Sequence, residues 1–496
     1  MYLLGYDCGT SSIKATLMEV ETGKVLASAI SPKKEMKIIS EHPGWAEQDP
    51  QTWWDNVIAA TRQIKKDFSF EADDLKAIGI SYQMHGLVTV DKNCRPIRPC
   101  IIWCDSRAVE TSEQLAQQIG QEKCFQTLLN LPGNFTASRL KWLKDNEPEN
   151  YNKIHKAMLP GEYVAMKMTD RIKTTPSGLS EWMLWDFRKH GLVRDFLSFY
   201  DFNEELLPES VPTFSNQGEL TKKAADELGL NTGTPVCYRA GDQPNNALSL
   251  NVLNPGEVAT TAGTSGVIYG IIDQPHYDKQ SRVNPFVHVN YSHETPRYGV
   301  LMCVAGTGIL NSWLQKNAAH DLSYDRMNEM ASKAPVGSED LFILPYGNSA
   351  ERTLINRDIG ASVHGLNFNI HNRSHLLRAA QEGIVFALNY GLSIMHDMSV
   401  KVETVRAGYA NMFLSPLFAQ AFANVTGAVV QLYNTDGSQG AARGAGIGAG
   451  IYKTYQDAFV GLDSKKTFEP DEKQAAAYKE AFQKWYDLLE SVLKYS

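Results

Sequence analysis

Two polar turns in the chain carry residue types that can hold a phosphate group. Both stand between apolar segments, half the chain apart, and their shared residues are Gly9, Thr10 and Ser11 in the first and Gly263, Thr264 and Ser265 in the second. Glycine main-chain N–H groups and threonine or serine hydroxyls can donate hydrogen bonds to an anion. One such turn also fits an ordinary hairpin, whereas the pair predicts a nucleotide held between two related halves.

An aspartate precedes the first of these turns. Asp7 would repel a phosphate unless a Mg²⁺ ion lay between them, and Mg²⁺ takes few protein carboxylates and keeps several waters. The sequence therefore predicts a Mg²⁺ site at Asp7, and the alternative is a turn-forming aspartate that accepts local N–H bonds. Lys14 either reaches a phosphate or is a solvated strand residue, and we favour the solvated residue.

A second acidic position lies in Ala-Gly-Asp-Gln-Pro-Asn-Asn-Ala, residues 240–247. Asp242 follows an apolar strand through a glycine and precedes a predicted helix. Its carboxylate can therefore point out from the strand end and act as a general base. An aspartate at this position can equally cap the helix, and both interpretations stay open from these residues alone.

Two loops carry side chains suited to a sugar. Residues 81–88 place Gln83, Met84 and His85 between two strands, where methionine can lie against a C–H face and histidine can bind hydroxyls. A histidine at a strand end also often has a structural role. Residues 101–108 are the second loop.

The second loop, Ile-Ile-Trp-Cys-Asp-Ser-Arg-Ala, supplies Trp103, Asp105 and Arg107. An indole ring, a carboxylate and a guanidinium can together contact sugar hydroxyls and the sugar face. The same three residues also fit a buried tryptophan beside an ion pair, and this alternative stays open.

Rigid elements must bring these side chains together. Alternation and turn residues predict three antiparallel strands at 2–6, 13–19 and 24–30, a helix at 49–67 and strands at 75–82 and 87–91. Asp49 and Pro50 are typical of a helix start. Three paired strands, a helix and further strands predict a ribonuclease-H-like α/β sheet.

The pattern restarts after residue 252. Strands at 257–262 and 267–273 flank the second polar turn, and a strand at 404–410 follows a long amphipathic helix at 373–399. Residues 438–452 form a helix of small residues that should pack closely on a neighbour, and a last helix covers 470–494. We expect the second half to be a rebuilt copy of the first.

Composition narrows the class of protein. A chain of 496 residues is too long to fold around a single hydrophobic core, so we expect two domains. The net charge of −8 argues against nucleic acid or an anionic membrane as the main partner. Seven scattered cysteines without a Cys-x-x-Cys pair, and no visible signal peptide or long apolar run, predict a cytoplasmic protein.

The motifs together resemble the FGGY carbohydrate kinase family over the whole chain, and most closely its xylulokinase branch. The matching stretches are residues 7–12, 42–54, 83–86, 101–107, 240–243, 262–266, 408–430 and 440–450. The resemblance implies two ribonuclease-H-like domains of the actin/hexokinase type with a central nucleotide/sugar cleft. An N-terminal sugar-binding domain would cover 1–251, and a C-terminal nucleotide-binding domain would cover 252–496.

The resemblance also implies a role for each candidate residue. Asp242 would be the proton acceptor, and Asp7 a catalytic group at the Mg²⁺ or phosphate site. The sugar would be contacted by Gln83, Met84, His85, Trp103, Asp105 and Gln243. ATP would be bound by Gly9, Thr10, Ser11, Gly263, Thr264, Ser265, Gly306, Gly408 and Asn411.

Three positions depart from the family pattern. Gln243 stands where an asparagine usually follows the catalytic aspartate, which puts one sugar contact in doubt. Arg139 replaces the usual lysine in its signature. Ala407 replaces the first of two glycines before the nucleotide turn, which would alter packing around adenine. None of these changes removes a catalytic group.

The implied reaction is ATP-dependent phosphorylation of a ketopentose, D-xylulose to D-xylulose 5-phosphate, with Mg²⁺ as cofactor. We expect sugar and ATP as partners, no nucleic acid or membrane, and a homodimer. A sibling kinase for ribulose, gluconate or glycerol is the nearest alternative. An actin- or chaperone-like ATPase and a catalytically inactive sugar-binding regulator are the others, although the 83–86 and 240–243 motifs argue against the ATPase.

Overall fold

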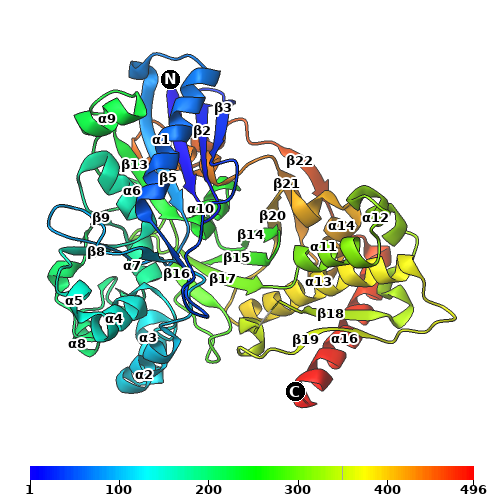
Figure 1. The fold of residues 1–496 in the computed structure, drawn as a ribbon. Coiled ribbons are helices and arrows are strands. Elements are labelled where there is room, and N and C mark those ends of the chain that lie inside the picture. The colour runs from blue at the N-terminus through cyan, green and yellow to red at the C-terminus, as the bar shows by residue number, and fades with distance from the viewer. Residues whose placement is uncertain (349, 496) are drawn as a thin grey trace. The chain divides into compact units, whose positions relative to one another are not determined.

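The structure is a computed structural model, and it describes residues 1–348 and 350–495. The chain divides into two compact units, each built around its own β-sheet (Figure 1). Unit 1 comprises Met1–Asn251, Phe286–Tyr298 and Thr435–Leu462, and unit 2 holds the rest of the described chain. One junction thus lies at residue 251, and two later segments also belong with unit 1. The sugar-binding and nucleotide-binding roles of the two parts stay predictions.

Unit 1 contains a five-stranded sheet with the order β13-β5-β1-β2-β3. Its strands are β1 (Tyr2–Cys8), β2 (Ile13–Glu19), β3 (Val25–Ser31), β5 (Leu75–Tyr82) and β13 (Val236–Gly241). The predicted antiparallel meander of the first three strands is confirmed, because β1 pairs with β2 and β2 with β3 in antiparallel register. The neighbours β5 and β13 run parallel to β1.

Helices and short strands complete unit 1. The helices are α1 (Pro50–Asp67), α2 (Val109–Ile119), α3 (Gln121–Leu128), α4 (Thr136–Asn146), α5 (Pro148–Tyr151), α6 (Pro160–Thr169), α7 (Pro176–Trp182), α8 (Arg194–Tyr200), α9 (Lys222–Leu228), α10 (Asp242–Ser249) and α15 (Gly437–Gly448). The short strands are β4 (Glu47–Gln48), β6 (Val88–Val90), β7 (Cys100–Ile101), β8 (Lys156–Met158), β9 (Lys173–Thr174), β10 (Trp185–Asp186), β11 (Gly191–Leu192) and β12 (Glu209–Ser210).

Local sequence explains two of these helices. The predicted cap of α1 is confirmed, since the Asp49 side chain accepts the Gln51 N–H at 2.9 Å and Pro50 opens the helix. Helix α15 is the predicted small-residue helix and packs directly on the sheet. A Cβ on Gly5 would lie 1.9 Å from the Ser438 carbonyl oxygen, so only glycine permits this close contact.

Unit 2 contains a seven-stranded sheet with the order β16-β17-β15-β14-β20-β21-β22. Its strands are β14 (Glu257–Ala262), β15 (Gly266–Ile272), β16 (Asn284–Val287), β17 (Tyr298–Val304), β20 (Thr404–Gly408), β21 (Val429–Tyr433) and β22 (Ser464–Phe468). The helices are α11 (Gly308–Asn317), α12 (Tyr324–Ala331), α13 (Arg373–His396), α14 (Pro416–Thr426) and α16 (Glu472–Tyr495), and β18 (Phe342–Tyr346) pairs with β19 (Gly360–His364).

The two large sheets share one topology. In unit 1, β1 pairs antiparallel with β2 and parallel with β5; in unit 2, β14 pairs antiparallel with β15 and parallel with β20. The order β13-β5-β1-β2-β3 therefore matches β21-β20-β14-β15-β17 strand for strand. The predicted α/β class with two sheet-containing domains is confirmed, and the two polar turns follow equivalent strands.

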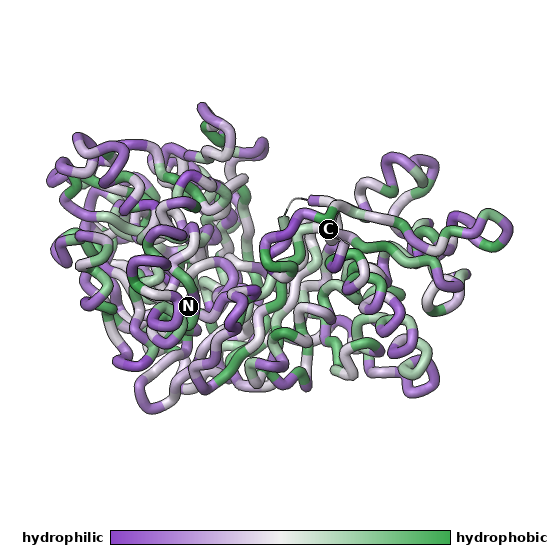
Figure 2. The backbone as a smooth tube through the Cα atoms, turned by 90° about the horizontal axis from the view of Figure 1, so that it is seen from below, coloured by the Kyte–Doolittle hydropathy of each residue, from purple (hydrophilic) through white to green (hydrophobic). Residues whose placement is uncertain are grey.

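In Figure 2, hydrophobic and hydrophilic stretches alternate along the described residues of both units. Among the described residues, no helix combines the length and hydropathy that a membrane crossing requires. The seven cysteines carry free thiols.

Candidate functional site

The carboxyl ends of three parallel strands bring several predicted residues to one edge of the unit 1 sheet. Tyr82 at the end of β5 pairs with Cys8 of β1 on one side and with Gly241 of β13 on the other. Asp7, the loop that starts at Gln83, and Asp242 therefore share this edge. In open α/β sheets, ligands bind at the carboxyl ends of the strands.

Asp7 lies among groups from three elements. Its Oδ1 accepts a hydrogen bond from Ser81 Oγ at 2.8 Å, and a Cβ on Gly437 would lie 2.4 Å from its Oδ2. The glycine therefore makes room for the carboxylate at the start of α15. Burial raises the pKa of Asp7, and the nearby Asp436 carboxylate adds to this rise.

Lys14 forms an ion pair with Asp436, with Nζ and Oδ2 2.6 Å apart. The favoured interpretation of Lys14 as a solvated strand residue is therefore wrong, because both side chains are partly buried and α15 begins at the paired aspartate. Asp436 also caps α15 by accepting the Ser438 N–H at 3.0 Å. The ion pair therefore connects β2, which follows the first polar turn, to the N-terminus of α15.

Asp242 is the first residue of α10, and the cap position belongs to Gly241. The side chain and main chain of Gln243 donate to the Asp242 carboxylate, which places Gln243 beside the proposed base. Burial, and then the Asp7 carboxylate, raise the pKa of Asp242 from its ordinary 3.8 to about 7. A carboxylate with this pKa is suited to general base catalysis near neutral pH.

A hydrogen-bond network joins the first polar turn to both sugar loops. Trp103 Nε1 donates to Thr10 Oγ1 at 3.0 Å, and this hydroxyl donates to Gln83 Oε1 at 3.1 Å. The Trp103 side chain is 54% exposed, so it is not the buried tryptophan of the alternative interpretation. Gly9 and Ser11 lie in the same turn, where the Gly9 N–H donates to Ser12 O and Ser11 O accepts the Met36 N–H.

Met84 and His85 lie next to the end of β13. Met84 is 5% exposed, and a Cβ on Gly241 would lie 2.6 Å from its Cγ, so Met84 packs directly against the residue that precedes Asp242. The His85 ring packs against Phe135 and Phe286 with ring centroids 4.6 and 5.6 Å away. The main chain of His85 has a φ of 63°, which is strained for a residue with a Cβ.

Asp105 is fully buried and its carboxylate is engaged by protein groups. Oδ2 accepts the Ala46 N–H at 2.6 Å and pairs with Arg107 Nη2 at 2.7 Å. The guanidinium of Arg107 in turn lies 3.7 Å from the centre of the Trp45 ring. These contacts favour the ion-pair interpretation of Asp105, and its sugar contact stays a prediction.

The second polar turn lies at the corresponding edge of the unit 2 sheet. Gly263 O accepts the Gly308 N–H at 2.7 Å and Thr307 Oγ1 at 2.9 Å, and Thr264 O accepts the Ile309 N–H at 3.2 Å. The start of α11 therefore fixes the turn from behind. A Cβ on Gly263 would lie 3.5 Å from Asn411 Nδ2, so the structure brings the two predicted residues together.

A pocket of about 440 Å³ opens beside this turn. Three predicted residues line it, namely Gly263, Thr264 and Asn411. Sequence analysis missed the polar residues that α11 and α12 contribute, which are Asn311, Ser312, Tyr324, Asp325 and Asn328. Their only signal was the polar face of two amphipathic helices, which is common to most surface helices.

Three predicted nucleotide residues of unit 2, Ser265, Gly306 and Gly408, do not line this pocket. Ser265 hydrogen-bonds the Cys303 thiol, and Gly408 ends β20 with its carbonyl accepting the Ala410 N–H at 2.8 Å. A Cβ on Gly306 would lie 1.6 Å from the Pro345 carbonyl oxygen, so this position requires glycine for packing. Their roles in binding ATP stay predictions.

Glu351 is a buried carboxylate that sequence analysis missed. It is 2% exposed, and its Oε1 accepts the Ala305 N–H at 2.7 Å. The Gly306 N–H also donates to it, while burial raises its pKa to about 7. Glu351 thus anchors residues 305–306, directly before the threonine that holds the second polar turn.

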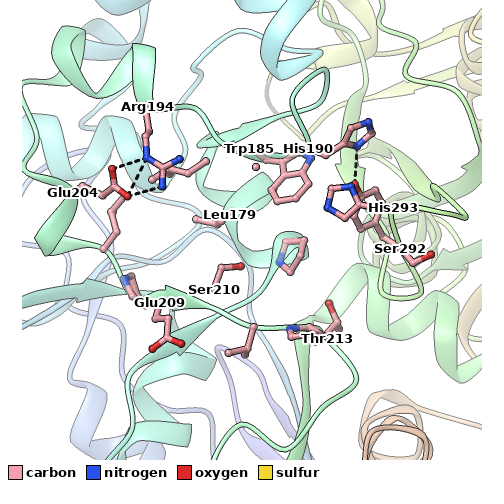
Figure 3. A pocket seen from close by; sticks show the side chains of 18 of the residues that line it. Leu179, Trp185, His190, Arg194, Glu204, Glu209, Ser210, Thr213, Ser292 and His293 are labelled. Atoms are coloured by element: carbon pink, nitrogen blue, oxygen red, sulfur yellow. Dashed lines mark hydrogen bonds and ion pairs between the residues drawn. The ribbon is translucent and has the colours of Figure 1, made fainter.

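A separate pocket of about 800 Å³ in unit 1 contains none of the predicted residues. Figure 3 shows Trp185, His190 and His293 on one side of it and the Arg194–Glu204 ion pair on the other. His190 Nδ1 lies 2.7 Å from the Tyr291 hydroxyl, and Arg194 Nη2 lies 2.9 Å from Glu204 Oε1. Four side chains of the wall thus pair with one another, His190 with Tyr291 and Arg194 with Glu204.

The carboxylates at this sheet edge are too few to bind Mg²⁺ by themselves, but they fit a Mg²⁺ ion that is also held by the phosphates of a nucleotide. Among residues 1–348 and 350–495, no group of three or more His, Cys, Asp or Glu side chains could hold a metal ion. Mg²⁺ that is carried by phosphates needs only one or two protein carboxylates. Asp7 and Asp242 supply two at one sheet edge, with Gly437 leaving space at Asp7 Oδ2.

Comparison with known proteins identifies the family. Residues 2–249 match the N-terminal domain of the FGGY family of carbohydrate kinases, and residues 258–451 match its C-terminal domain. The chain belongs to the FGGY family of carbohydrate kinases. It is therefore a sugar kinase that transfers a phosphoryl group from ATP to a sugar hydroxyl, and the ATPase and inactive-regulator alternatives lose their support.

Relatives cover nearly the whole chain. The xylulose kinase of Escherichia coli is 28% identical over 99% of this chain and 99% of its own length. An L-xylulose/3-keto-L-gulonate kinase of the same organism is 29% identical over 98% of this chain and 96% of its own. The crystal structure of xylulose kinase from Rhodospirillum rubrum is 25% identical, with a TM-score of 0.89 over 100% of this chain and 99% of that one.

Proposed function

We propose that this FGGY kinase phosphorylates a ketopentose, converting D-xylulose to D-xylulose 5-phosphate with ATP. The single observation that carries the proposed chemistry is Asp242, whose pKa of about 7 follows from burial and the neighbouring Asp7 at the end of β13. The xylulose kinases among its full-length relatives support the choice of sugar.

Asp242 acts as the general base in this proposal. Its carboxylate accepts the proton of the terminal sugar hydroxyl as that oxygen bonds to the γ-phosphorus, and the bond from phosphorus to the β-phosphate oxygen breaks to release ADP. Gln243 holds the carboxylate through its side-chain and main-chain N–H groups. Above its pKa of about 7, Asp242 is ionised and ready to take the proton.

Residues of the two sugar loops hold the substrate. Gln83, Trp103 and Thr10 are joined by hydrogen bonds. Met84 packs against Gly241, so one of the proposed sugar contacts lies next to the residue that precedes the base. His85 provides a polar ring for sugar hydroxyls. Fixed donors and acceptors select a sugar because the wrong sugar leaves them unpaired.

The nucleotide groups come from both polar turns. In unit 2, Gly263, Thr264 and Asn411 beside the pocket, with Ser265, Gly306 and Gly408 nearby, bind ATP. In unit 1, Gly9, Thr10 and Ser11 are phosphate ligands. Asp7 would hold Mg²⁺, which neutralises phosphate charge when bound.

A second candidate substrate is L-xylulose or 3-keto-L-gulonate. The observation that favours it is the relative of that name, which is 29% identical to this chain, beside 28% for the xylulose kinase of the same organism. These sugars all carry a ketone and a terminal hydroxyl that can be phosphorylated. L-Xylulose differs from D-xylulose in the configuration of its hydroxyl groups, whereas 3-keto-L-gulonate is a six-carbon acid, and the same base can take the terminal hydroxyl proton of each.

The setting of the enzyme is also part of the proposal. Seven free thiols support a reducing, cytoplasmic location. A homodimer is supported by exposed hydrophobic side chains of unit 2, which include Trp313, Leu366 and Phe368. Light scattering after size exclusion measures the mass directly and separates one chain of 55.2 kDa from two.

A sugar panel tests the proposed function. The purified chain is assayed by ADP release with D-xylulose, L-xylulose, 3-keto-L-gulonate, D-ribulose, L-ribulose, gluconate and glycerol, and the product is identified by phosphorus NMR. We expect D-xylulose to give the highest kcat/KM and a 5-phosphate. Another sugar that exceeds it about tenfold, a difference of about 1.4 kcal/mol, would replace D-xylulose while leaving the kinase chemistry in place.

A further inference from the structure

The main chain of His85 is held on both sides by the buried ionisable side chains of Glu181 and Arg139. Its N–H donates to Glu181 Oε1, and its carbonyl oxygen accepts from Arg139 Nη1. Glu181 lies on α7 and is 1% exposed, and Arg139 lies on α4 and is 0% exposed. A residue with a Cβ and a φ of 63° needs such support, because the left-handed conformation is unfavourable by itself.

Arg139 reaches the second sugar loop as well. Its Nη2 donates to the carbonyl oxygens of Trp103 at 2.8 Å and Asp105 at 3.3 Å. One planar guanidinium therefore bonds to His85 in the first loop and to two residues in the second. Lysine has a single nitrogen on a flexible stem and cannot reproduce this fork.

Glu181 completes the support from the opposite side. Its Oε2 accepts the Tyr82 hydroxyl at 3.1 Å, at the last residue of β5. Burial raises its pKa well above the ordinary range, while the His85 N–H and the Tyr82 hydroxyl oppose that rise. The carboxyl group thus joins the loop to the strand from which it emerges.

We propose that Arg139 and Glu181 are positioning residues that fix the two sugar loops relative to each other, and that this clamp sets the affinity for the sugar. The inference rests on the proposed function, because it requires His85 and Trp103 to contact the sugar. Arg139 touches neither the sugar nor the reacting atoms. Its effect reaches the substrate through the carbonyl groups that it holds.

Arg139→Lys keeps the charge and removes the fork. We expect the sugar KM to rise about tenfold or more, because buried carbonyl groups lose their donors. The ATP KM should stay within about threefold, because the clamp touches no nucleotide group. Hydrogen exchange, measured without any sugar, should speed up together in residues 83–88 and 101–107.

Two comparisons separate the clamp from a general loss of stability. Arg443 is another buried arginine that donates to the Ala458 and Val460 carbonyls in unit 1, so Arg443→Lys is the matched control. This variant should lower the melting temperature without raising the sugar KM or exchange in the two loops. Glu181→Gln keeps an acceptor for the His85 N–H and should retain the sugar KM that Glu181→Ala loses.

Three results would overturn the inference. The clamp is refuted if Arg139→Lys leaves exchange in both loops unchanged, or if it raises both KM values equally. Faster exchange in both loops with an unchanged KM for every sugar would show that these loops do not bind sugar. In that case the assigned sugar site fails together with the inference, whereas a wild-type chain that prefers another sugar of the panel would refute only the assignment of D-xylulose, and the KM for that sugar would then test the clamp.

Discussion

Burial and the carboxylate of Asp7, near the end of β1, raise the pKa of Asp242 at the start of α10 to about 7. The base is thus ionised only when the pH reaches the neutral range. The parallel pairing of β1 and β13 with β5 places both residues at one sheet edge. The pH dependence of the enzyme follows from this relationship.

The kcat/KM for the sugar should rise with pH and level off above about 7. Asp242 binds a proton below its folded-state pKa of about 7, and the protonated carboxyl cannot accept the hydroxyl proton. The measurement is kcat/KM from pH 5 to 9 at saturating ATP and Mg²⁺. A flat profile down to pH 5 would mean that a group with an ordinary carboxyl pKa is the base.

Asp242→Asn should be more stable than the wild type at pH 8. The folded-state pKa of about 7 lies above the ordinary 3.8, so ionisation costs more free energy in the folded chain than in the unfolded chain. The penalty is absent below about pH 4, grows as the pH rises to about 7 and is full above it, reaching about 4 kcal/mol. Urea unfolding at pH 8 and pH 4 measures the difference, and an equal gain at both pH values would contradict the electrostatic explanation.

Asp7→Ala should lower kcat strongly and increase the Mg²⁺ concentration required for half-maximal rate. The variant removes the carboxylate proposed to hold the ion, while the sugar loops keep their hydrogen bonds. Titration of activity with Mg²⁺ at fixed ATP is the measurement. Asp457→Ala changes an exposed carboxylate of unit 1 and serves as the control. Wild-type kinetics in excess Mg²⁺ and ATP would support the turn-forming interpretation of Asp7.

Much of the fold could be predicted because local patterns determined it. Alternating apolar residues defined the meander, and Asp49 with Pro50 marked the start of α1. Asp7 and Asp242 could be identified because each directly follows a mostly apolar run of residues, and parallel pairing then brings the strand ends together. The repeat of two polar turns likewise matches two sheets of the same topology.

Contacts between distant segments could not be predicted. Lys14 pairs with Asp436, which lies 422 residues further along the chain in the segment Thr435–Leu462 of unit 1, after two of the three segments of unit 2. Glu351 is a polar residue in a loop, and only the tertiary structure shows that its buried carboxylate accepts the Ala305 N–H. Neither contact leaves a pattern in a single sequence, so both partners could be found only from the structure.

Glu351→Ala should raise the KM for ATP and leave the sugar KM nearly unchanged. The variant leaves the Ala305 and Gly306 N–H groups without their acceptor, beside the segment that holds Gly263 and Thr264. An unsatisfied buried donor typically costs about 1–3 kcal/mol, or roughly 5- to 150-fold in KM if the whole cost appears in binding. Glu351→Gln keeps an acceptor and should recover most of the affinity. Equal increases in both KM values would show a general loss of structure instead.

The most direct test of the central claim is kcat for D-xylulose with Asp242→Asn. The amide keeps the shape of the side chain but cannot take the proton, so we expect kcat to fall by about 10²–10⁴. Calorimetry should show that the variant still binds D-xylulose and ATP. A variant that retains more than about a tenth of the wild-type kcat, a barrier change below about 1.4 kcal/mol, would contradict the assignment of Asp242 as the base.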